Sequence, residues 1–336
     1  MRKTKDISLE EIAKLADVSI ATVSRVINNK DNVSSKTRER IMKIIEDKNY
    51  ELNDRQKKAR NTSEVSKTIV ILVPDFSNPF NATVIDGIKK AAKKNDFYIS
   101  VVLAKEENVA FEYYENILQD INVAGIVALS AFPSLEIALQ VNRKWPLVMC
   151  SEHWGSPEIS HVGIDDVKAS MQATEFLLTS GRKKIALVNG TLNRKYARDR
   201  ETGYRKALGK SNIPICDDSI IHLSTISYSI ALSHLIFLFN NKPDIDAVFA
   251  CSDIFAAAAI EAAKQVGKKI PEEIAIIGFD NIDLTLMISP TITTINQPSF
   301  EIGYHSCDIL MESIQKPYLE PKNVTLFTDF IIREST

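Results

Sequence analysis

The sequence predicts an α/β protein with a small all-α head, a short hinge segment and a two-lobed core of doubly wound parallel sheets. Two observations along the chain support this division. Up to about residue 50 apolar residues recur at helical spacing, whereas after Lys67 continuous apolar strands alternate with helices. The length of 336 residues also exceeds that of one ordinary core. We therefore expect a head at residues 1–52, a hinge at 53–67 and a core at 68–336.

The head and the core carry opposite net charge. Residues 1–60 contain 15 Lys or Arg against 10 Asp or Glu, and the remaining residues contain 26 against 33. A basic head on an acidic body indicates that only the head meets a polyanion. A solvated basic tail would have the same charge, but the helical periodicity of the head favours a folded domain.

The head is expected to contain three short helices. The first begins after Ser8, because Ser8 and Glu11 have the spacing of a capping box. Its apolar face is expected to consist of Ile12, Leu15 and Ala16. Asp17 follows at a turn, where a short polar side chain tolerates the left-handed conformation.

The second helix is expected to be capped by Ser19, and the third to begin at Ser34 or Ser35. The buried stripes of these two helices are expected to be Val23, Val26 and Ile27, and Ile41, Ile44 and Ile45. Two helices joined by a tight turn and supported by a third form a helix-turn-helix.

The outer face of the second helix suits DNA. The residues at i, i+3, i+4 and i+7, which are expected to share the face away from the core, are Ala21, Ser24, Arg25 and Asn28. Small residues allow close approach to a major groove, hydroxyls and amides bond to its walls, and an arginine can reach a guanine. No carboxylate lies between Asp17 and Asp31 to repel phosphates. A partner-protein surface is the alternative, and pattern and charge together favour DNA.

Residues 6–53 resemble the DNA-binding head of the LacI/GalR family of bacterial transcription regulators, through ADVSIATVSRVIN (16–28) and VSSKTRER (33–40). The resemblance implies that Ile20 and Ala21 select base sequence and that Arg25 reads a base edge. Contacts to the DNA backbone are implied for Ser19, Thr22, Ser24 and Asn28. The DNA contacts that we expect are completed by Ser8, Asn53 and Lys57. Asp17 stands where the family usually has a turn glycine.

The hinge departs further from the family. Its polar, basic sequence alone predicts a flexible connector. The resemblance implies a short helix after Asn53 that orders on operator DNA and offers a leucine as a wedge in the minor groove. That position is Ala59 here, and Leu52 stands at the usual proline. Either the hinge kinks DNA less, or it relies on phosphate contacts. The basic residues for such contacts are Arg55, Lys57, Lys58 and Arg60.

The core is expected to form parallel sheets covered by helices on both faces, because its strands are apolar throughout and separated by helices. These strands are TIVILV (68–73), YISVVL (98–103), GIVAL (125–129), PLVMC (146–150), HVGI (161–164), KIALVN (184–189), DAVFAC (246–251) and EIAIIGF (273–279).

An internal similarity predicts two lobes. Residues 86–99 and 202–215 share a glycine, two lysines, an alanine and an isoleucine at one offset of 116. Two unrelated amphipathic helices could match in this way, but we favour a repeat. We expect an N-lobe at about 68–163 and 291–318, and a C-lobe at about 164–290 and 319–336.

Polar residues just beyond the strands are the candidates for a ligand site, because two such lobes place their strand carboxyl ends at a shared cleft. Hydroxyls, an arginine and an aspartate around an aromatic ring suit a polyol. The candidate set is Asp75, Phe80, Ser130, Ser151, Arg198, Arg200, Ser252 and Asp280. Each could instead be a turn or capping residue, and for Asp253 we favour a helix cap.

The core also resembles the LacI/GalR family, through PDFSNPF (74–80), CSDIFAAAAIEAA (251–263), PEEIAIIGFDNID (271–283) and TTINQP (293–298). The resemblance implies a periplasmic-binding-protein type I core that forms a homodimer and binds a small effector, often a sugar or nucleobase. Ser151 and Ser252 replace the usual aspartate and asparagine, so the effector is left open. Some members bind a phosphocarrier protein through an arginine at the position of Asp308, which argues against that co-regulator here. The sequence ends at IIREST without a leucine heptad, which favours a dimer over a tetramer.

Other functional classes fit the sequence less well. It contains no phosphate loop, no G-x-S-x-G elbow and no H-E-x-x-H or paired-cysteine spacing, so we expect no enzyme, no metal and no cofactor. A solute-binding protein would have such a core, but also a signal peptide and no basic head. We therefore expect a cytoplasmic regulator, without membrane contact, that binds double-stranded operator DNA and whose operator affinity is controlled by a sugar-like effector. A sensor without direct DNA regulation is the alternative.

Overall fold

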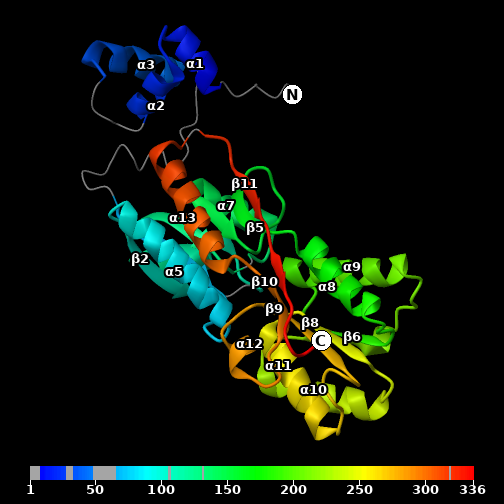
Figure 1. The fold of residues 1–336 in the computed structure, drawn as a ribbon. Helices are drawn as coiled ribbons and strands as arrows, with labels where there is room; N and C mark the ends of the chain where they lie inside the picture. Colours follow the sequence, from blue (N-terminus) through cyan, green and yellow to red (C-terminus); the bar gives the residue numbers. More distant parts are fainter. Residues whose placement is uncertain (1–7, 28–32, 48–65, 105–106, 131, 318) are drawn as a thin grey trace.

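The computed structural model describes residues 8–27, 33–47, 66–104, 107–130, 132–317 and 319–336 (Figure 1). The predictions for Asn28, Asn53, Lys57 and Ala59 therefore lie outside the described residues. Within the described part of the chain, no helix is both long and apolar enough to cross a membrane.

The head contains three helices, α1 (Leu9–Leu15), α2 (Ile20–Ile27) and α3 (Ser35–Asp47). The predicted capping box is present, since the backbone N–H of Glu11 donates to Ser8 Oγ at 3.2 Å and that of Ser8 to Glu11 Oε2 at 3.0 Å. Ser19 Oγ accepts from the N–H of Thr22 at 3.1 Å, which confirms the cap of α2. Asp17 has a φ of 48°, as expected for the turn between α1 and α2.

The core of the head corrects one prediction. Its buried apolar residues are Ile12, Ala13, Ala16, Val23, Val26, Ile27, Ile41 and Ile45. Leu15, which we expected on the buried face of α1, is 53% exposed. The buried face is centred between Ile12 and Ala13, and at about 100° per residue Leu15 lies about 110° from that centre.

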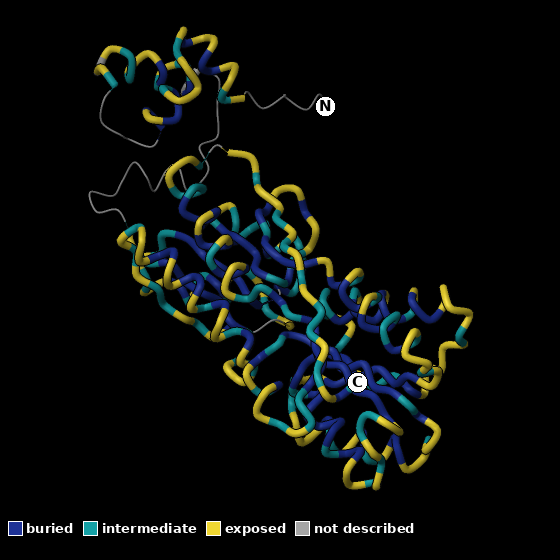
Figure 2. The backbone as a smooth tube through the Cα atoms, in the orientation of Figure 1, coloured by how far each residue is buried: buried dark blue, intermediate teal, exposed yellow. Residues whose placement is uncertain are grey.

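The first lobe is a six-stranded parallel sheet in the order β11-β5-β4-β3-β1-β2. Its strands are β1 (Thr68–Val73), β2 (Tyr98–Leu103), β3 (Val123–Ala128), β4 (Leu147–Cys150), β5 (Ser160–Ile164) and β11 (Asn323–Leu326). One face is covered by α5 (Pro79–Lys94) and α13 (Ser299–Gln315), the other by α6 (Phe111–Leu118) and α7 (Leu135–Lys144). The central strands are buried on both faces, as predicted from their continuous apolar sequence (Figure 2).

The second lobe repeats this plan with the order β12-β10-β9-β8-β6-β7, in which only the edge strand β12 is antiparallel. Its strands are β6 (Ile185–Gly190), β7 (Ile220–Leu223), β8 (Ala247–Ala250), β9 (Ala275–Asp280), β10 (Thr293–Asn296) and β12 (Asp329–Ile331). Its helices are α8 (Asp166–Thr179), α9 (Lys195–Lys210), α10 (Tyr228–Asn241), α11 (Asp253–Gln265), α12 (Leu284–Met287) and the 3-10 turn Asp217–Ser219. Helices α8 and α9 cover one face, and α10 and α11 the other.

Two lobe boundaries differ from the prediction. We expected residues 291–318 in the first lobe, but β10 extends the second sheet by pairing with β9. We expected residues 319–336 in the second lobe, but β11 joins the first sheet beside β5. Both strands have only four residues, and so short a strand contains no signal for the sheet edge that it joins. The chain therefore crosses between lobes after β5, after β10 and after β11.

The internal similarity corresponds to equivalent helices, since α5 and α9 both have 16 residues and begin 116 residues apart. In each helix the shared glycine lies against the backbone of a neighbouring helix. A Cβ on Gly87 would lie 2.1 Å from the carbonyl oxygen of Phe300, and one on Gly203 would lie 2.4 Å from that of Val167. The glycines thus allow α5 to approach α13, and α9 to approach α8, at equivalent places in the two lobes.

Candidate functional site

A cavity of about 290 Å³ lies between the two lobes, at the carboxyl ends of their strands. The first lobe contributes Pro74, Asp75, Asn78, Phe80, Asn81, Leu129, Ser151 and Glu152. The second lobe contributes Thr191, Arg194, Tyr196, Arg200, Leu223, Ser224, Thr225, Ile226, Cys251 and Asp280. At the crossings between the lobes the cavity is also lined by Ile164, which ends β5, by Asp166, which begins α8, and by Gln297, which follows β10. A ligand here would therefore touch both lobes and two of the segments that join them.

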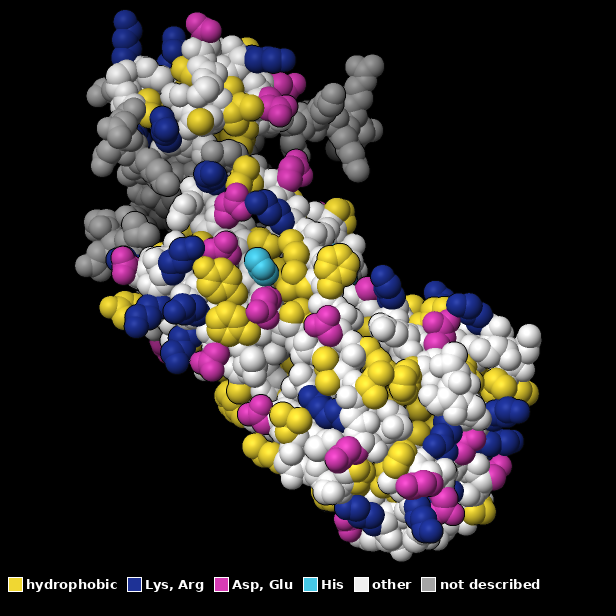
Figure 3. Space-filling view, in the orientation of Figure 1, with side chains coloured by type: hydrophobic (Ala, Val, Ile, Leu, Met, Phe, Trp, Pro, Cys, Tyr) yellow, Lys and Arg dark blue, Asp and Glu magenta, His cyan; other side chains and the backbone are white. Residues whose placement is uncertain are grey.

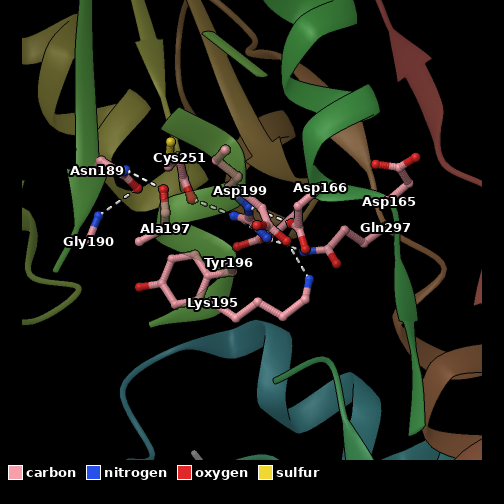
Figure 4. Close-up of polar contacts among 12 residues, drawn as sticks. Asp165, Asp166, Asn189, Gly190, Lys195, Tyr196, Ala197, Asp199, Cys251 and Gln297 are labelled. Atoms are coloured by element: carbon pink, nitrogen blue, oxygen red, sulfur yellow. Dashed lines mark hydrogen bonds and ion pairs between the residues drawn. The ribbon is translucent and has the colours of Figure 1, made fainter. Parts of the chain in front are cut away.

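Arg200 lines the cavity and is held by contacts with Asp166 and Cys251, which are labelled in Figure 4. Its Nε donates to Asp166 Oδ1 at 2.8 Å and its Nη1 to the carbonyl oxygen of Cys251 at 2.7 Å. Its guanidinium carbon lies 3.6 Å from the ring centroid of Phe279 and 4.9 Å from that of Tyr196. Burial lowers the pKa of Arg200, but Asp166 and Asp280 raise it above its ordinary value, so the guanidinium stays charged.

Asp280 ends β9 and faces Arg200, with 3.9 Å between its Oδ1 and Arg200 Nη1. Its backbone has a φ of 113°, a conformation that L residues rarely adopt. Gln297, from the segment after β10, donates to the same Oδ1 at 2.6 Å. Burial raises the pKa of Asp280 to about 6, although Arg200 and Gln297 act in the opposite direction. This carboxylate therefore changes charge near neutral pH and touches a crossing segment.

Glu152 joins the two lobes beside the cavity. It follows β4 in the first lobe, and its carboxylate accepts from the backbone N–H groups of Lys195 at 3.0 Å and Tyr196 at 2.9 Å. These N–H groups open α9 of the second lobe, so Glu152 caps that helix where its dipole favours a negative charge. Burial raises the pKa of Glu152, and the two N–H donors partly offset this effect.

Two buried hydroxyl groups of the cavity are available to a ligand. Ser151 Oγ and Thr191 Oγ1 line the cavity and make no hydrogen bond to any described residue. Ser151 has a φ of 67°, which turns the chain sharply after β4. Unpaired buried hydroxyls are costly, so a ligand that bonds to them gains binding free energy.

Five of the eight predicted ligand residues line this cavity, namely Asp75, Phe80, Ser151, Arg200 and Asp280. The other three, Ser130, Arg198 and Ser252, do not. Ser130 is buried after β3, where its N–H bonds to the carbonyl oxygen of Leu72 at 3.2 Å. Ser252 is fully buried, and its hydroxyl caps α11 by accepting from the N–H of Ile254 at 3.3 Å.

Arg198 points away from the cavity because it lies two residues from Arg200 on one helix, which separates the two side chains by about 200°. Its Nη1 donates to the carbonyl oxygens of Leu192 and Asn193, each at 2.8 Å. Of the two predicted arginines, Arg200 therefore lines this cavity, whereas Arg198 holds the loop before α9.

Asp253, for which we favoured a capping role, is a buried carboxylate outside the cavity. It accepts from the N–H of Ile282 at 2.9 Å and from Thr294 Oγ1 at 2.6 Å. Asp253 thus holds the loop after β9 and strand β10 in place, which positions Asp280. Among the described residues, no group of three His, Cys, Asp or Glu side chains is placed to hold a metal ion.

Several cavity residues were missed from the sequence. Asp166 follows β5 in the same way that the predicted residues follow their strands, so the same rule could have found it. Gln297 lies in the quoted TTINQP motif. Glu152 lies two residues after β4, as Asp166 does after β5, so the same rule could have found it as well. Arg194 lies four residues after β6, and its place at the cavity depends on how the two lobes meet.

The outer surface of α2 agrees with most of the prediction for the head. Ser19, Ile20, Ala21 and Arg25 are exposed, Thr22 is partly exposed, and no acidic residue lies in the first turn of α2. Ser24, which we placed on the outer face, is buried. It lies about 60° around the helix from the buried Ile27, so the apolar face of this helix extends over it. Ser8 is exposed, but its hydroxyl is engaged in the capping box.

Comparison with known families decides the class of protein. Residues 8–53 match the model described as bacterial regulatory proteins of the lacI family. Residues 66–334 match that of periplasmic binding proteins and the sugar binding domain of the LacI family. The chain belongs to the LacI family. As a LacI-family protein it is a DNA-binding transcriptional regulator whose head and cavity are the two parts described above.

Relatives of this LacI-family chain match it over nearly their whole length. The transcriptional repressor CytR of Escherichia coli strain K12 is 29% identical over 330 residues, covering 98% of this chain and 96% of that protein. The ribose operon repressor of Haemophilus influenzae is 30% identical over 332 residues, covering 98% of each. The solved complex of the regulator CelR with cellobiose has a TM-score of 0.75 at 28% identity, covering 98% of this chain and all of that one.

Proposed function

We propose that this LacI-family protein is a repressor that binds operator DNA as a homodimer, and that a neutral sugar in the cavity controls its operator affinity. The observation that carries the proposal is the position of Arg200, Asp166 and Asp280. These charged groups are fixed by each other at the junction of the two lobes, where a ligand can bond to them.

The chemistry of the cavity favours a neutral polyol over an anion. Adjacent hydroxyls can donate to a carboxylate and accept from a guanidinium. The lining contains four carboxylates, Asp75, Glu152, Asp166 and Asp280, against two guanidiniums, Arg194 and Arg200. This balance opposes a phosphate or carboxylate ligand by repulsion. Phe80 offers a ring to the apolar face of a sugar. The relatives named for ribose and solved with cellobiose support this class.

Operator binding rests on the exposed end of α2. Ile20 and Ala21 would lie against base edges, Arg25 would bond to a guanine, and Ser19 and Thr22 would bond to phosphates. Lys and Arg side chains also project from the described surface of the head (Figure 3). Asn28, Asn53 and Lys57 complete the proposed contacts from outside the described residues.

A homodimer would cover large apolar side chains on both lobes. Tyr98 and Leu103 are exposed on the edge strand β2, and Phe237, Leu286 and Met287 are exposed on α10 and α12. Met287 has 77% of its surface exposed. Exposed apolar side chains mark a contact surface where they form a contiguous patch, which is what the proposed dimer requires of these residues. Two heads held by such a dimer would each bind one half of a near-palindromic operator.

The ligand would act through the crossing segments. Asp166 and Gln297 belong to segments that join the lobes, and Gln297 donates to Asp280 inside the cavity. A sugar that bonds to these residues favours one angle between the lobes and thereby one spacing of the paired heads. A coupling of about 1–3 kcal/mol changes operator affinity by roughly five- to hundredfold.

Two measurements on the full chain test this proposal. Selection from a random pool of duplexes should yield a near-palindromic site, and Arg25→Ala should lose about 1–3 kcal/mol of discrimination at one base pair of each half-site. A melting screen with neutral sugars and sugar phosphates should give stabilisation by a neutral sugar. No selected site, or stabilisation by sugar phosphates alone, would contradict the proposal.

A further inference from the structure

Helix α9 differs from its neighbour α8 in how its first turn is capped. The N-cap residue of α8 is Asp165, whose Oδ1 accepts from the N–H of Lys168 at 2.9 Å. The N-cap residue of α9 is Arg194, and its side chain makes no capping bond. Because the first N–H groups of a helix have no partner within the helix, α9 needs an acceptor from elsewhere in the molecule.

That acceptor is Glu152, which belongs to the other lobe. Its Oε2 accepts from the N–H of Lys195 at 3.0 Å, and its Oε1 accepts from the N–H of Tyr196 at 2.9 Å. Each oxygen therefore serves one N–H group, and the carboxylate lies where the helix dipole favours a negative charge. Glu152 is only 6% exposed, so losing these donors without gaining water would leave a buried charge unpaired. The two lobes are thus joined here by bonds between protein groups, which need no ligand.

The same helix provides two side chains that line the cavity. Tyr196 is one of the residues whose N–H bonds to Glu152, and Arg200 follows one turn later. Their side chains are in contact, since the guanidinium carbon of Arg200 lies 4.9 Å from the ring centroid of Tyr196. In the first lobe, Glu152 directly follows Ser151, which also lines the cavity. Glu152 therefore sets the distance between two opposite walls of the cavity.

A second contact between the lobes supports the same turn of α9. Glu107 of the first lobe accepts from Asn193 Nδ2 in the loop before α9. Arg198 Nη1 donates to the carbonyl oxygens of Leu192 and Asn193, each at 2.8 Å, and ties this loop to the helix. Glu107 and Asn193 are exposed, whereas Glu152 is buried. The bonds of Glu152 are therefore the stronger restraint, because hydrogen bonds are strengthened where water is excluded.

We propose that Glu152 is a positioning residue for the effector, and that it holds Tyr196 and Arg200 of the second lobe in the arrangement that the effector binds. This inference rests on the proposed function and concerns how the cavity is prepared for its ligand. A ligand that bonds to both lobes binds only when they are correctly placed, so its apparent affinity falls with the fraction of molecules in that arrangement. Glu152 raises this fraction, and it acts through α9 rather than through a bond to the ligand.

The variant Glu152→Gln tests this role with little change in size. An amide has one acceptor oxygen and its nitrogen is a donor, so one of the two N–H groups loses its partner and the charge is removed. We expect the N–H groups of Lys195 and Tyr196 to exchange with deuterium about tenfold faster than in the parent protein. The affinity for a neutral sugar should fall by about tenfold, because fewer molecules hold the binding arrangement.

The variant Asp165→Asn is the matched control. It makes the same chemical change at the cap of α8, but there one oxygen accepts from one N–H, and an asparagine keeps that bond. Asp165 does not line the cavity. This variant should leave both the exchange at α9 and the sugar affinity as in the parent protein.

Two measurements on the full chain follow these effects. Hydrogen exchange detected by mass spectrometry, without sugar, reports the protection of the first turn of α9. Calorimetric titration with a panel of neutral sugars that includes ribose and cellobiose reports the affinity. If Glu152→Gln does not fold, Glu152→Asp takes its place, since its shorter side chain keeps both oxygens and should give smaller losses of protection and of affinity.

The possible failures are distinguishable. The proposal is overturned by parent-like exchange at the start of α9 in Glu152→Gln, or by faster exchange with unchanged sugar affinity. Weaker sugar binding with parent-like exchange would instead make Glu152 a direct ligand contact, and equal losses in Asp165→Asn would assign the effect to helix capping in general. If no sugar of the panel binds the parent protein, the proposed sugar effector is wrong, whereas the exchange comparison still decides whether Glu152 holds α9.

Discussion

Among single residues, the charged side chains of the cavity are fixed in position by ion pairs and hydrogen bonds to one another. Arg200 is bonded to Asp166 and to the Cys251 carbonyl, so its direction is set before a ligand arrives. Asp280 lies in a backbone conformation that is unusual for its type and is bonded to Gln297. Such pre-arranged groups lose little conformational entropy on binding, which favours affinity and selectivity.

The pKa of Asp280 predicts a pH dependence of ligand binding. Burial raises this pKa to about 6, so the carboxylate is ionised at pH 7.5 and mostly protonated at pH 5. The protonated form accepts fewer hydrogen bonds from ligand hydroxyls, and affinity should fall about tenfold between these values. Calorimetric titration across this range measures the effect. Asp280→Asn should bind the ligand more weakly at pH 7.5, and its ligand affinity should vary less with pH. If its affinity varies with pH as in the parent protein, the proton belongs to another group.

At the scale of elements, the two lobes depend on close helix pairs that the shared glycines permit. Gly203 of α9 leaves no room for a Cβ, because the carbonyl oxygen of Val167 and the N–H nitrogen of Met171 would lie 2.4 and 2.8 Å away. Gly209, on the same helix, has nothing within 4 Å of that position. One helix therefore contains a glycine required for packing and one that is free to change.

This difference predicts opposite effects on stability. Gly203→Ala forces α8 and α9 apart and should lower the free energy of unfolding by about 1–3 kcal/mol. Gly209→Ala should leave it unchanged or raise it by about 0.5–1 kcal/mol, because alanine loses less backbone entropy in a helix. Melting temperatures of the two variants and the parent protein measure both effects. A normal melting temperature for Gly203→Ala would show that the helices can separate at little cost.

Some helices and strands could be predicted from the sequence, whereas the pairing of two strands could not. The three helices of the head, its caps and the apolar core strands were predictable, since each depends on a local pattern such as Ser8 with Glu11. The sheet that receives β10 or β11 depends on pairing between distant residues, and a four-residue strand does not encode it. The same limit applies to the cavity. Asp280 was found because it ends a buried strand, and Glu152 lies just after another, but its contact with α9 of the other lobe has no local signal.

At the scale of the whole molecule, the cavity is placed where it can control the head. Its walls belong to both lobes, and Asp166 and Gln297 belong to the crossing segments. Any ligand that bonds to these residues changes the relative free energies of the possible lobe angles. The cavity and the DNA-binding face are therefore two sites whose binding free energies are coupled through the arrangement of the lobes.

The most direct test of this coupling is the operator affinity of the full chain, with and without a saturating sugar, in the parent protein and in Asp280→Ala. Fluorescence anisotropy with a labelled operator duplex provides the measurement. We expect the sugar to change the affinity of the parent protein by roughly five- to hundredfold. Asp280→Ala should bind the operator as tightly as the sugar-free parent and should not respond to the sugar. Loss of operator binding in Asp280→Ala, or a parent protein that binds the sugar without any change in operator affinity, would contradict the account.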